Sequence, residues 1–195
     1  MIETERLLLR EWRESDKASY AALNADPLVM EHFPSTMTPQ QSEQMVDRMS
    51  AAFDTRGYGL WATEVKETGA FIGFIGLSAP TWDAPFTPCV EVGWRLAKES
   101  WGHGYAPEGA AAALEFGFTH VDLPRDEVVS FTTVDNTKSR RVMDKLGLTH
   151  DPADDFDHPM LPDWVGRRHV LYRISREQWQ LRSASVHELS HVRGS

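Results

Sequence analysis

The sequence has almost no cysteine, no long apolar run and no excess of basic residues. Its single cysteine, Cys89, excludes an intramolecular disulfide framework and fits a reducing compartment. No apolar run approaches the roughly 20 residues of a membrane span. Charged side chains also interrupt the N-terminal segment, so we expect neither membrane association nor a signal peptide. The formal net charge of −9 argues against a nucleic-acid partner, whose phosphates require basic patches. We therefore expect a cytoplasmic protein.

The composition is typical of one globular domain of ordinary size. Hydrophobic residues make up 41% of the 195 residues and charged residues 25%, which excludes a disordered chain. No internal repeat or linker divides the sequence. We expect residues 1–182 to form a single domain. Residues 183–195 lack a convincing apolar face, and we expect them to form a flexible C-terminal tail.

One stretch, residues 90–118, organises the rest of the chain. Its first part, residues 90–96, alternates apolar with polar or small side chains, which is the period of a half-buried strand. A short loop with two glycines follows, and from Tyr105 apolar residues recur at helical spacing. A strand, a glycine-bearing loop and a helix in this order direct free backbone N–H groups at an anion. The stretch therefore predicts a phosphate or pyrophosphate at the N-terminus of the helix.

The remaining sequence alternates between strand and helix patterns. Ser15 or Asp16 is expected to cap the first helix, and Thr38 with Gln41 to form a capping box on the second, which Gly57 ends. Two segments rich in Pro or Asp predict loops at residues 78–89 and 151–163. The predicted strands are residues 5–12, 59–65, 71–77, 90–96, 127–133 and 169–174, and the predicted helices are residues 15–23, 38–57, 105–118, 135–147 and a short one from residue 175.

Two motifs give the central stretch a family resemblance. Glu91-x-Gly93-Trp94 and Trp101-Gly102-x-Gly104-Tyr105-Ala106-x-Glu108 resemble the acyl-CoA-binding core of the GCN5-related N-acetyltransferases, the GNAT family. Within that family the sequence looks most like the ribosomal-protein N-terminal acetyltransferase branch, which the opening TERLLLR also resembles. The resemblance covers roughly residues 4–179. It implies an α/β (α+β) fold, in which a mixed twisted sheet is flanked by helices. Its central strands, residues 90–96 and 127–133, would lie parallel and splay apart to admit the pantetheine arm.

The resemblance also implies acetyl-CoA as co-substrate and no metal. Backbone amides of residues 101–106 would wrap the pyrophosphate of the cofactor. Asn136 lies in an Asn-x-x-Ser motif of the same branch and would bind the pantetheine region. The residues assigned to cofactor binding are Val92, Trp94, Trp101, Gly102, His103, Gly104, Tyr105, Ala106, Asn136 and Ser139.

Acetyl transfer requires a fixed thioester, a deprotonated amine and a stabilised leaving thiolate. In this family the amine attacks directly, so Cys89 is expected to be structural rather than a nucleophile. By the resemblance, Glu91 is the general base through a water and Ser139 is the general acid beside the thioester sulfur. Two alternatives stay open. Glu91 would instead be a structural carboxylate, paired for example with Arg95, or Asn136 would only cap a helix.

The acceptor is the least defined part of the prediction. The resemblance implies a primary amine, either a protein or peptide N-terminus or a small molecule, bound by a monomer or homodimer. A second function class is a non-catalytic acyl-CoA-binding regulatory module. The residues expected to contact the acceptor lie in loops and are His32, Phe33, Trp82, Asp83 and His158.

One motif in the C-terminal segment suggests different chemistry. His187-Glu188-Leu189-Ser190-His191 fits the H-E-x-x-H pattern of zinc peptidase helices. No third ligand follows it, so we attribute the match to chance and expect no metal site.

Overall fold

The computed structural model describes the backbone of residues 1–192 and the side chains of residues 1–184. The strands are β1 (Ile2–Glu3), β2 (Leu7–Arg10), β3 (Leu60–Val65), β4 (Ala70–Ser78), β5 (Glu91–Leu96), β6 (Glu127–Thr133), β7 (Thr149–His150), β8 (Phe156–Asp157) and β9 (Arg168–Ser175). The helices are α1 (Asp16–Ala25), α2 (Pro39–Arg56), α3 (Tyr105–His120), α4 (Thr137–Leu146) and α5 (Arg176–Val192), with short 3-10 helices η1 (Lys98–Ser100) and η2 (Pro152–Asp154).

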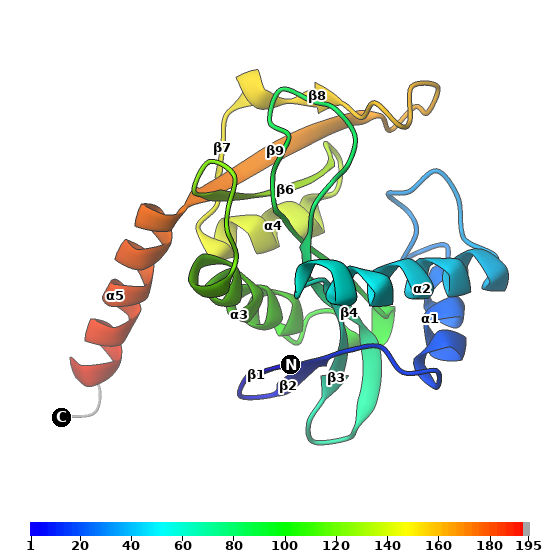
Figure 1. Cartoon of the computed structure of the whole chain (residues 1–195), viewed down its shortest axis with the longest axis horizontal. Helices are drawn as coiled ribbons and strands as arrows, with labels where there is room; N and C mark the ends of the chain where they lie inside the picture. Colours follow the sequence, from blue (N-terminus) through cyan, green and yellow to red (C-terminus); the bar gives the residue numbers. More distant parts are fainter. Residues whose placement is uncertain (193–195) are drawn as a thin grey trace.

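The strands form one mixed sheet in the order β1-β2-β3-β4-β5-β6-β9-β7, with β8 paired to β9 (Figure 1). All neighbouring strands are antiparallel except β5 and β6, which are parallel. This parallel pair has a single register position, Glu91 opposite Val129, whereas β4 and β5 pair at six positions. The predicted mixed sheet with two splayed central strands is therefore confirmed.

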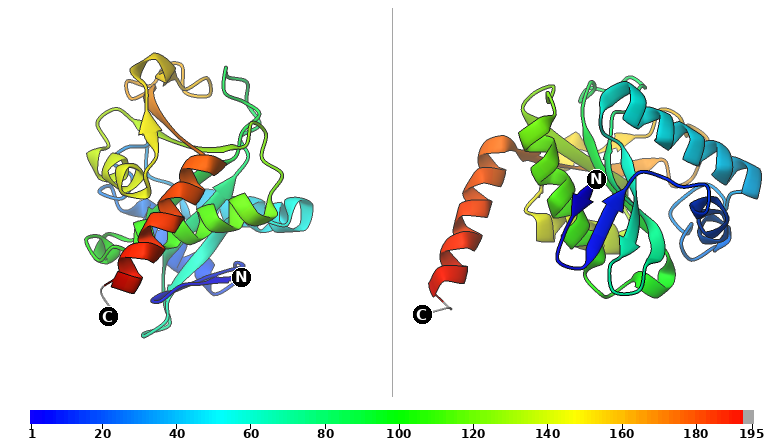
Figure 2. Two further views of the ribbon diagram at one scale, coloured as in Figure 1. Left: turned by 90° about the vertical axis from the view of Figure 1, so that its left-hand side faces the viewer. Right: turned by 60° about the horizontal axis from the view of Figure 1, so that its bottom comes forward.

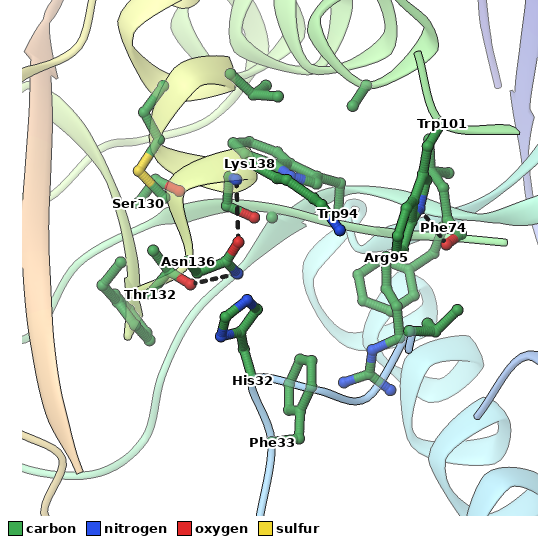
Figure 3. A pocket seen from close by; sticks show the side chains of 18 of the residues that line it. His32, Phe33, Phe74, Trp94, Arg95, Trp101, Ser130, Thr132, Asn136 and Lys138 are labelled. Carbon is green, nitrogen blue, oxygen red and sulfur yellow. Dashed lines mark hydrogen bonds between the residues drawn. The ribbon is translucent and has the colours of Figure 1, made fainter. Parts of the chain in front are cut away.

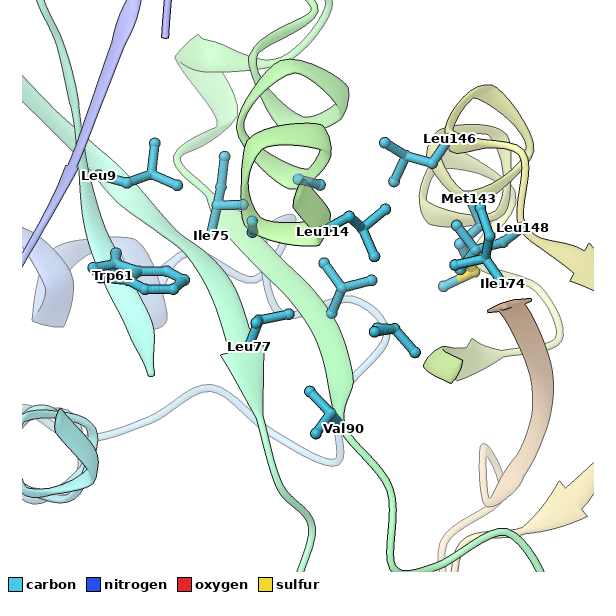
Figure 4. Packing of buried hydrophobic residues seen from close by; sticks show 14 of the residues in the cluster. Leu9, Trp61, Ile75, Leu77, Val90, Leu114, Met143, Leu146, Leu148 and Ile174 are labelled. Carbon is cyan, nitrogen blue, oxygen red and sulfur yellow. The ribbon is translucent and has the colours of Figure 1, made fainter. Parts of the chain in front are cut away.

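Helices cover both faces of this sheet (Figure 2). On one face, α3 packs its small residues and Leu114 against Ile75 and Leu77 of β4, while α4 adds Met143 and Leu146 (Figure 4). On the other face, α1 and α2 enclose a smaller cluster around Phe74. The side chains of β5 divide accordingly, since Val92 lies in the cluster under α3 and Arg95 reaches α1. Glu91, Gly93 and Arg95 therefore share the α1–α2 face.

The caps expected from the sequence are partly confirmed. Thr38 Oγ1 accepts a hydrogen bond from the Gln41 amide, and the Gln41 side chain accepts one from the Thr38 amide. Gly57 ends the helix in the left-handed region with φ of 74°. The expectation of a Ser15 or Asp16 cap on α1 is wrong. Ser15 makes no capping bond, and the buried Asp16 carboxylate binds the Arg10 guanidinium at 2.7 and 2.9 Å.

The C-terminal third departs most from the expectation. Two short strands and η2 lie within or beside the segment predicted as an Asp-rich loop, because β9 offers them backbone partners. Helix α5 continues to Val192 where a short helix and a tail were expected (Figures 1 and 2). Its first turns pack on α3, since the Trp179 indole donates to Glu115 at 2.7 Å. The side chains of the H-E-x-x-H motif lie outside those that the structure describes.

Two features of the described residues bear on other function classes. None of the described helices is both long and apolar enough to cross a bilayer. Among the same residues, no three His, Cys, Asp or Glu side chains gather as metal ligands would.

Gly73 holds β4 close to β5 beside the site, and its replacement provides a test of this packing. Gly73 has φ of +129°, and an added Cβ would lie 2.1 Å from the Arg95 carbonyl oxygen. We expect Gly73→Ala to lower the free energy of unfolding by about 2 kcal/mol or more, through backbone strain and overlap. Urea unfolding measures the change. The matched control is Gly93→Ala, whose Cβ meets Glu91 Oε1 at an ordinary 3.7 Å. Equal losses in the two variants would contradict this packing.

Candidate active site

The candidate site is the space that opens where β5 and β6 separate. The Val129 amide donates to the Val90 carbonyl at 2.9 Å, and the Ser130 hydroxyl donates to the Val92 carbonyl at 2.8 Å. Beyond these two bonds the strands diverge, and a cavity of about 930 Å³ runs between them (Figure 3). Its walls come from β5, β6, the loop before α3, the start of α4 and the loops around residues 28–34 and 158–164.

The glycine-bearing loop forms one end of this cavity. Gly102 and Gly104 both have φ of +81°, and Gly104 immediately precedes the first residue of α3. No side chain caps this helix, so its first amides point free toward the loop. These are the features of an anion site that the sequence predicted.

Contacts from the turn between β1 and β2 fix the loop, and no sequence pattern indicated them. The Arg6 guanidinium donates to the His103 carbonyl at 2.9 Å and to Glu108 Oε2 at 2.7 Å. The same guanidinium lies 5.0 Å from the centre of the Tyr105 ring. Thr4 adds a hydrogen bond of 2.6 Å to Glu108. Glu108 therefore orients the loop through the turn between β1 and β2, more than 100 residues away in sequence.

Glu91 lies at the end of the cavity where the two strands are still paired. Its carboxylate accepts a hydrogen bond of 2.9 Å from the Ser78 hydroxyl. Burial raises the pKa of Glu91 to about 7, and the Ser78 hydrogen bond opposes that rise only in part. No ion pair joins Glu91 to Arg95, whose guanidinium instead binds Asn24 at 2.7 Å. The alternative of a Glu91–Arg95 salt bridge is therefore wrong.

Asn136 and Ser139 lie across the cavity from β5. The Ser139 amide donates to Asn136 Oδ1 at 3.1 Å, and Asn136 Nδ2 donates to Thr132 at 2.9 Å (Figure 3). Asn136 is thus the cap of α4, as the alternative interpretation held. The Ser139 side chain lines the cavity. Its hydroxyl makes no hydrogen bond to any other residue that the structure describes.

The predicted site residues come together with three exceptions. Val92 is fully buried in the core under α3, so its side chain does not reach the cavity. Trp82 lies behind the cavity wall, with its ring centre 4.8 Å from that of His158. Asp83 is exposed in the same loop between β4 and β5. The predicted residues that line the cavity are His32, Phe33, Glu91, Trp94, Trp101, Gly102, His103, Gly104, Tyr105, Ala106, Asn136, Ser139 and His158.

Other lining residues were missed by the sequence prediction. Lys138 places its ammonium 4.2 Å from the centre of the Trp101 ring, which joins α4 to the glycine-bearing loop. Arg141 and Lys145 follow at helical spacing and also line the cavity. The spacing of these three cations was a usable signal for a basic edge on α4. Arg95 was expected only as an ion-pair partner of Glu91, so its place on the cavity wall was also missed.

The structure also bears on the cysteine. Cys89 is buried, and burial raises the pKa of its thiol to about 11. A thiol in that state stays protonated at neutral pH and is a poor nucleophile.

A twisted mixed sheet with a splayed parallel pair and a glycine-bearing helix N-terminus fits the class of acyltransferases that take their acyl group from coenzyme A. The model of the acetyltransferase (GNAT) domain matches residues 6–149 of the chain. The chain therefore belongs to the GNAT acetyltransferases and is an acetyl-CoA-dependent enzyme, in agreement with the resemblance seen in its motifs.

Individual relatives agree with this assignment. The chain is 32% identical to the FsC-acetyl coenzyme A-N(2)-transacetylase of Aspergillus fumigatus over an alignment of 187 residues. This alignment covers 91% of this chain and 77% of that protein. Its fold is similar to an acetyltransferase from Bacillus anthracis, with a TM-score of 0.73, 24% identity and coverage of 90% and 98%. It is also similar to Mycobacterium smegmatis RimJ in complex with CoA-disulfide, with a TM-score of 0.69, 21% identity and coverage of 88% and 83%.

The raised pKa of Glu91 makes a prediction about stability. The folded state binds the proton of Glu91 more tightly than the unfolded state, whose carboxyl has an ordinary pKa near 4.3. Stability is therefore lost as the pH rises from that value to about 7. Glu91→Gln keeps an oxygen that accepts the hydrogen bond from the Ser78 hydroxyl, but its side chain never ionises. We therefore expect the variant to be more stable than the parent protein at pH 8 by about 1–3 kcal/mol.

Urea unfolding at pH 4.5 and pH 8 measures this difference, which should nearly vanish at the lower pH. Glu99→Gln, at an exposed position of η1, is the matched control and should show no such pH dependence. A Glu91→Gln protein that is less stable at pH 8 would show that the charged carboxylate is stabilising.

Proposed function

We propose that the protein transfers the acetyl group of acetyl-CoA to a primary amine by direct attack in a ternary complex. The observation that carries this proposal is a carboxyl group with a pKa of about 7 at the paired end of the slot between β5 and β6. A base is most effective when its pKa lies near the working pH. The non-catalytic alternative gives no reason to bury such a group in the cavity.

The cavity supplies a plausible path for the cofactor. The amides of residues 102–106 at the start of α3 suit the pyrophosphate, because helix N-termini favour negative charge. The Trp101 amide already donates to the Lys98 carbonyl at 3.1 Å. The cationic edge formed by Lys138, Arg141 and Lys145 suits further phosphate. The slot between β5 and β6 suits the pantetheine arm, which would bring the thioester toward Ser139. These residues fit acetyl-CoA without a metal ligand.

In the proposed reaction, the amine nitrogen attacks the thioester carbonyl carbon. The C–N bond forms and the C–S bond breaks. The proton that the amine must lose passes through a water to the Glu91 carboxylate. The leaving thiolate takes a proton from the Ser139 hydroxyl, which regains one from solvent. The acetylated amine, free coenzyme A and the protonated Glu91 are the balanced products.

We further propose that the acceptor nitrogen is an α-amine, as in the ribosomal-protein N-terminal acetyltransferase branch. An α-amine has a pKa near 8, whereas an alkylamine has one near 10, so the α-amine needs less help from a base that acts through water. The TERLLLR opening and the Asn136–Ser139 motif support this branch. The relative from Aspergillus fumigatus is named for transfer to a nitrogen numbered N(2).

The proposed function is tested by following thiol release from acetyl-CoA across a panel of peptide, amino-acid and polyamine acceptors. We expect turnover with at least one α-amine. Binding of acetyl-CoA without turnover on any amine would favour the regulatory module.

Glu91→Gln tests the proposed base. We expect kcat to fall on the order of 10- to 1000-fold, in line with general acid–base contributions. The loss should be constant below pH 7, because ionised Glu91 and neutral amine increase together there. Well above pH 7 the ionised fraction of the carboxyl no longer increases while neutral amine still does, so the loss should shrink. Steady-state kinetics from pH 6 to 9 give the profile. An equal loss at every pH would mean that Glu91 only positions groups.

Ser139→Ala tests the proposed acid and separates it from the cap. The Asn136 side chain bonds the backbone of residue 139, so this substitution leaves the cap intact. We expect kcat to fall about 10- to 100-fold with acetyl-CoA affinity unchanged, since the hydroxyl acts only on the leaving sulfur. Binding titration and kinetics measure the two quantities. An unchanged kcat would return Ser139 to a structural role.

A further inference from the structure

Arg95 is a buried cation without an anionic partner. It is 9% exposed, and its Nη1 donates to Asn24 Oδ1 at 2.7 Å and contacts the Tyr20 hydroxyl at 3.4 Å. Its Nε is buried and has no hydrogen-bond partner. Among the side chains that the structure describes, no carboxylate lies within ion-pair distance of Arg95, although the chain has 29 acidic residues.

Aromatic rings hold the guanidinium against the cavity wall. The centre of the Phe33 ring lies 4.2 Å from Arg95 Cζ and that of Phe74 lies 5.6 Å away. Figure 3 shows Phe33 beside the guanidinium, with His32 next to it facing Asn136. Arg95, Phe33 and His32 all line the same cavity as Glu91. A planar guanidinium stacked in this way keeps its edge available for a second planar group.

Such an arrangement is costly unless an anion completes it. Transfer of an unpaired charge from water into a protein interior carries a large desolvation penalty. Burial accordingly lowers the pKa of Arg95. The amide of Asn24 and the phenol of Tyr20 satisfy part of the guanidinium but cannot neutralise it. A bound carboxylate would accept hydrogen bonds from the guanidinium and also neutralise its charge, because its two oxygens match the guanidinium fork geometrically.

We propose that Arg95 binds a carboxylate of the acceptor, so that the enzyme acetylates amines that also carry a free carboxylate, such as amino acids or short peptides. This inference rests on the proposed function, because it assigns the class of acceptor to the same cavity. Glu91 and Arg95 share one face of β5, and four residues of strand separate their Cα atoms by about 13 Å. An acceptor lying along this face would place its amine near Glu91 and its carboxylate near Arg95.

A phosphate of coenzyme A is a less suitable occupant. Arg95 projects from the face of the sheet that α1 and α2 cover, and binds Asn24 of α1. The free amides at the start of α3 and the cations of α4 belong to elements on the opposite face. The cofactor phosphates therefore have a separate site of their own.

The test uses alanine and alanine oligomers of two to four residues, each as the free acid and as the C-terminal amide. These pairs differ only in the charge at the carboxyl end, and their lengths vary the distance from amine to carboxylate. We expect kcat/KM to favour the free acid by at least about 10-fold at one or more lengths, as for a charge-assisted hydrogen bond. Equal values at every length would overturn the inference while leaving the proposed function intact.

Variants assign the preference to Arg95. Arg95→Met keeps much of the apolar stem and should reduce the acid-to-amide ratio toward one. Asn24→Asp places a carboxylate beside the guanidinium and should reduce the same ratio without removing Arg95. Arg56→Met, at an exposed position near the end of α2, is the matched control and should keep the ratio. The assignment would be overturned if the acid-to-amide ratio stayed unchanged in both site variants. It would also be overturned if the variants lowered acetyl-CoA affinity and left the ratio unchanged.

A binding measurement keeps the test independent of turnover and of folding losses. The unmodified protein is saturated with coenzyme A and titrated calorimetrically with the N-acetylated acids and amides of the same series. Tighter binding of the acids at one or more lengths supports the inference even where no acceptor turns over. Binding without any difference between acid and amide contradicts it. If no amine reacted but the acids still bound more tightly than the amides, the proposed function would be contradicted and the carboxylate site at Arg95 would stand.

Discussion

The site depends on how little of β5 is bonded to β6. The two strands share one register position; the Val129 amide also donates to the Val90 carbonyl, and the Ser130 hydroxyl donates to the Val92 carbonyl. Every other neighbouring pair in the sheet is antiparallel. No register position pairs the two strands beyond Glu91 and Val129, and unpaired backbone groups are costly unless something else occupies the gap. A cofactor arm with amide groups can supply such partners. The fold therefore creates its binding slot by omitting bonds at the centre of the sheet, while α3 and α4 on one face and α1 and α2 on the other hold the strands apart.

In the two proposals, two charged residues on one face of β5 have separate tasks in the slot. Glu91 is held without a cation, and burial moves its pKa to about 7, where a carboxyl can both accept and release a proton near neutrality. Arg95 is held without an anion and stacked on Phe33. Had the two formed a salt bridge, each would have neutralised the other, and neither would be available to a substrate. Their separation on the strand, with three residues between them, leaves both groups available for the proposed tasks.

Local sequence patterns predicted much of this structure. The limits of β6, the capping box at Thr38 and the cap at Asn136 depend on neighbouring residues only, so their signals are contained in a few positions. The contacts that the sequence did not reveal join distant segments. Arg6 fixes the glycine-bearing loop, which lies about a hundred residues later in the sequence. Arg95 donates its hydrogen bond to Asn24 of α1 and not to Glu91 of its own strand. Strand alternation placed Glu91 and Arg95 on one face, but their partners come from α1 and β4, whose positions only the fold determines. The length of α5 was missed for the same reason, because its first turns gain stability by packing on α3.

The distribution of charge follows from the same division of tasks. The protein carries a net charge of −9, yet the cavity wall brings together Arg95 with three cations of α4, namely Lys138, Arg141 and Lys145. Local concentration of one sign in a cleft attracts oppositely charged ligands even when the whole molecule repels them. In the proposed function, the phosphates of acetyl-CoA would account for the cations of α4. Arg95 lies on the other face of the sheet, where no phosphate is needed. A carboxylate on the acceptor therefore explains why one cation is buried on the side from which the amine approaches, within a protein that otherwise has an excess of acidic groups.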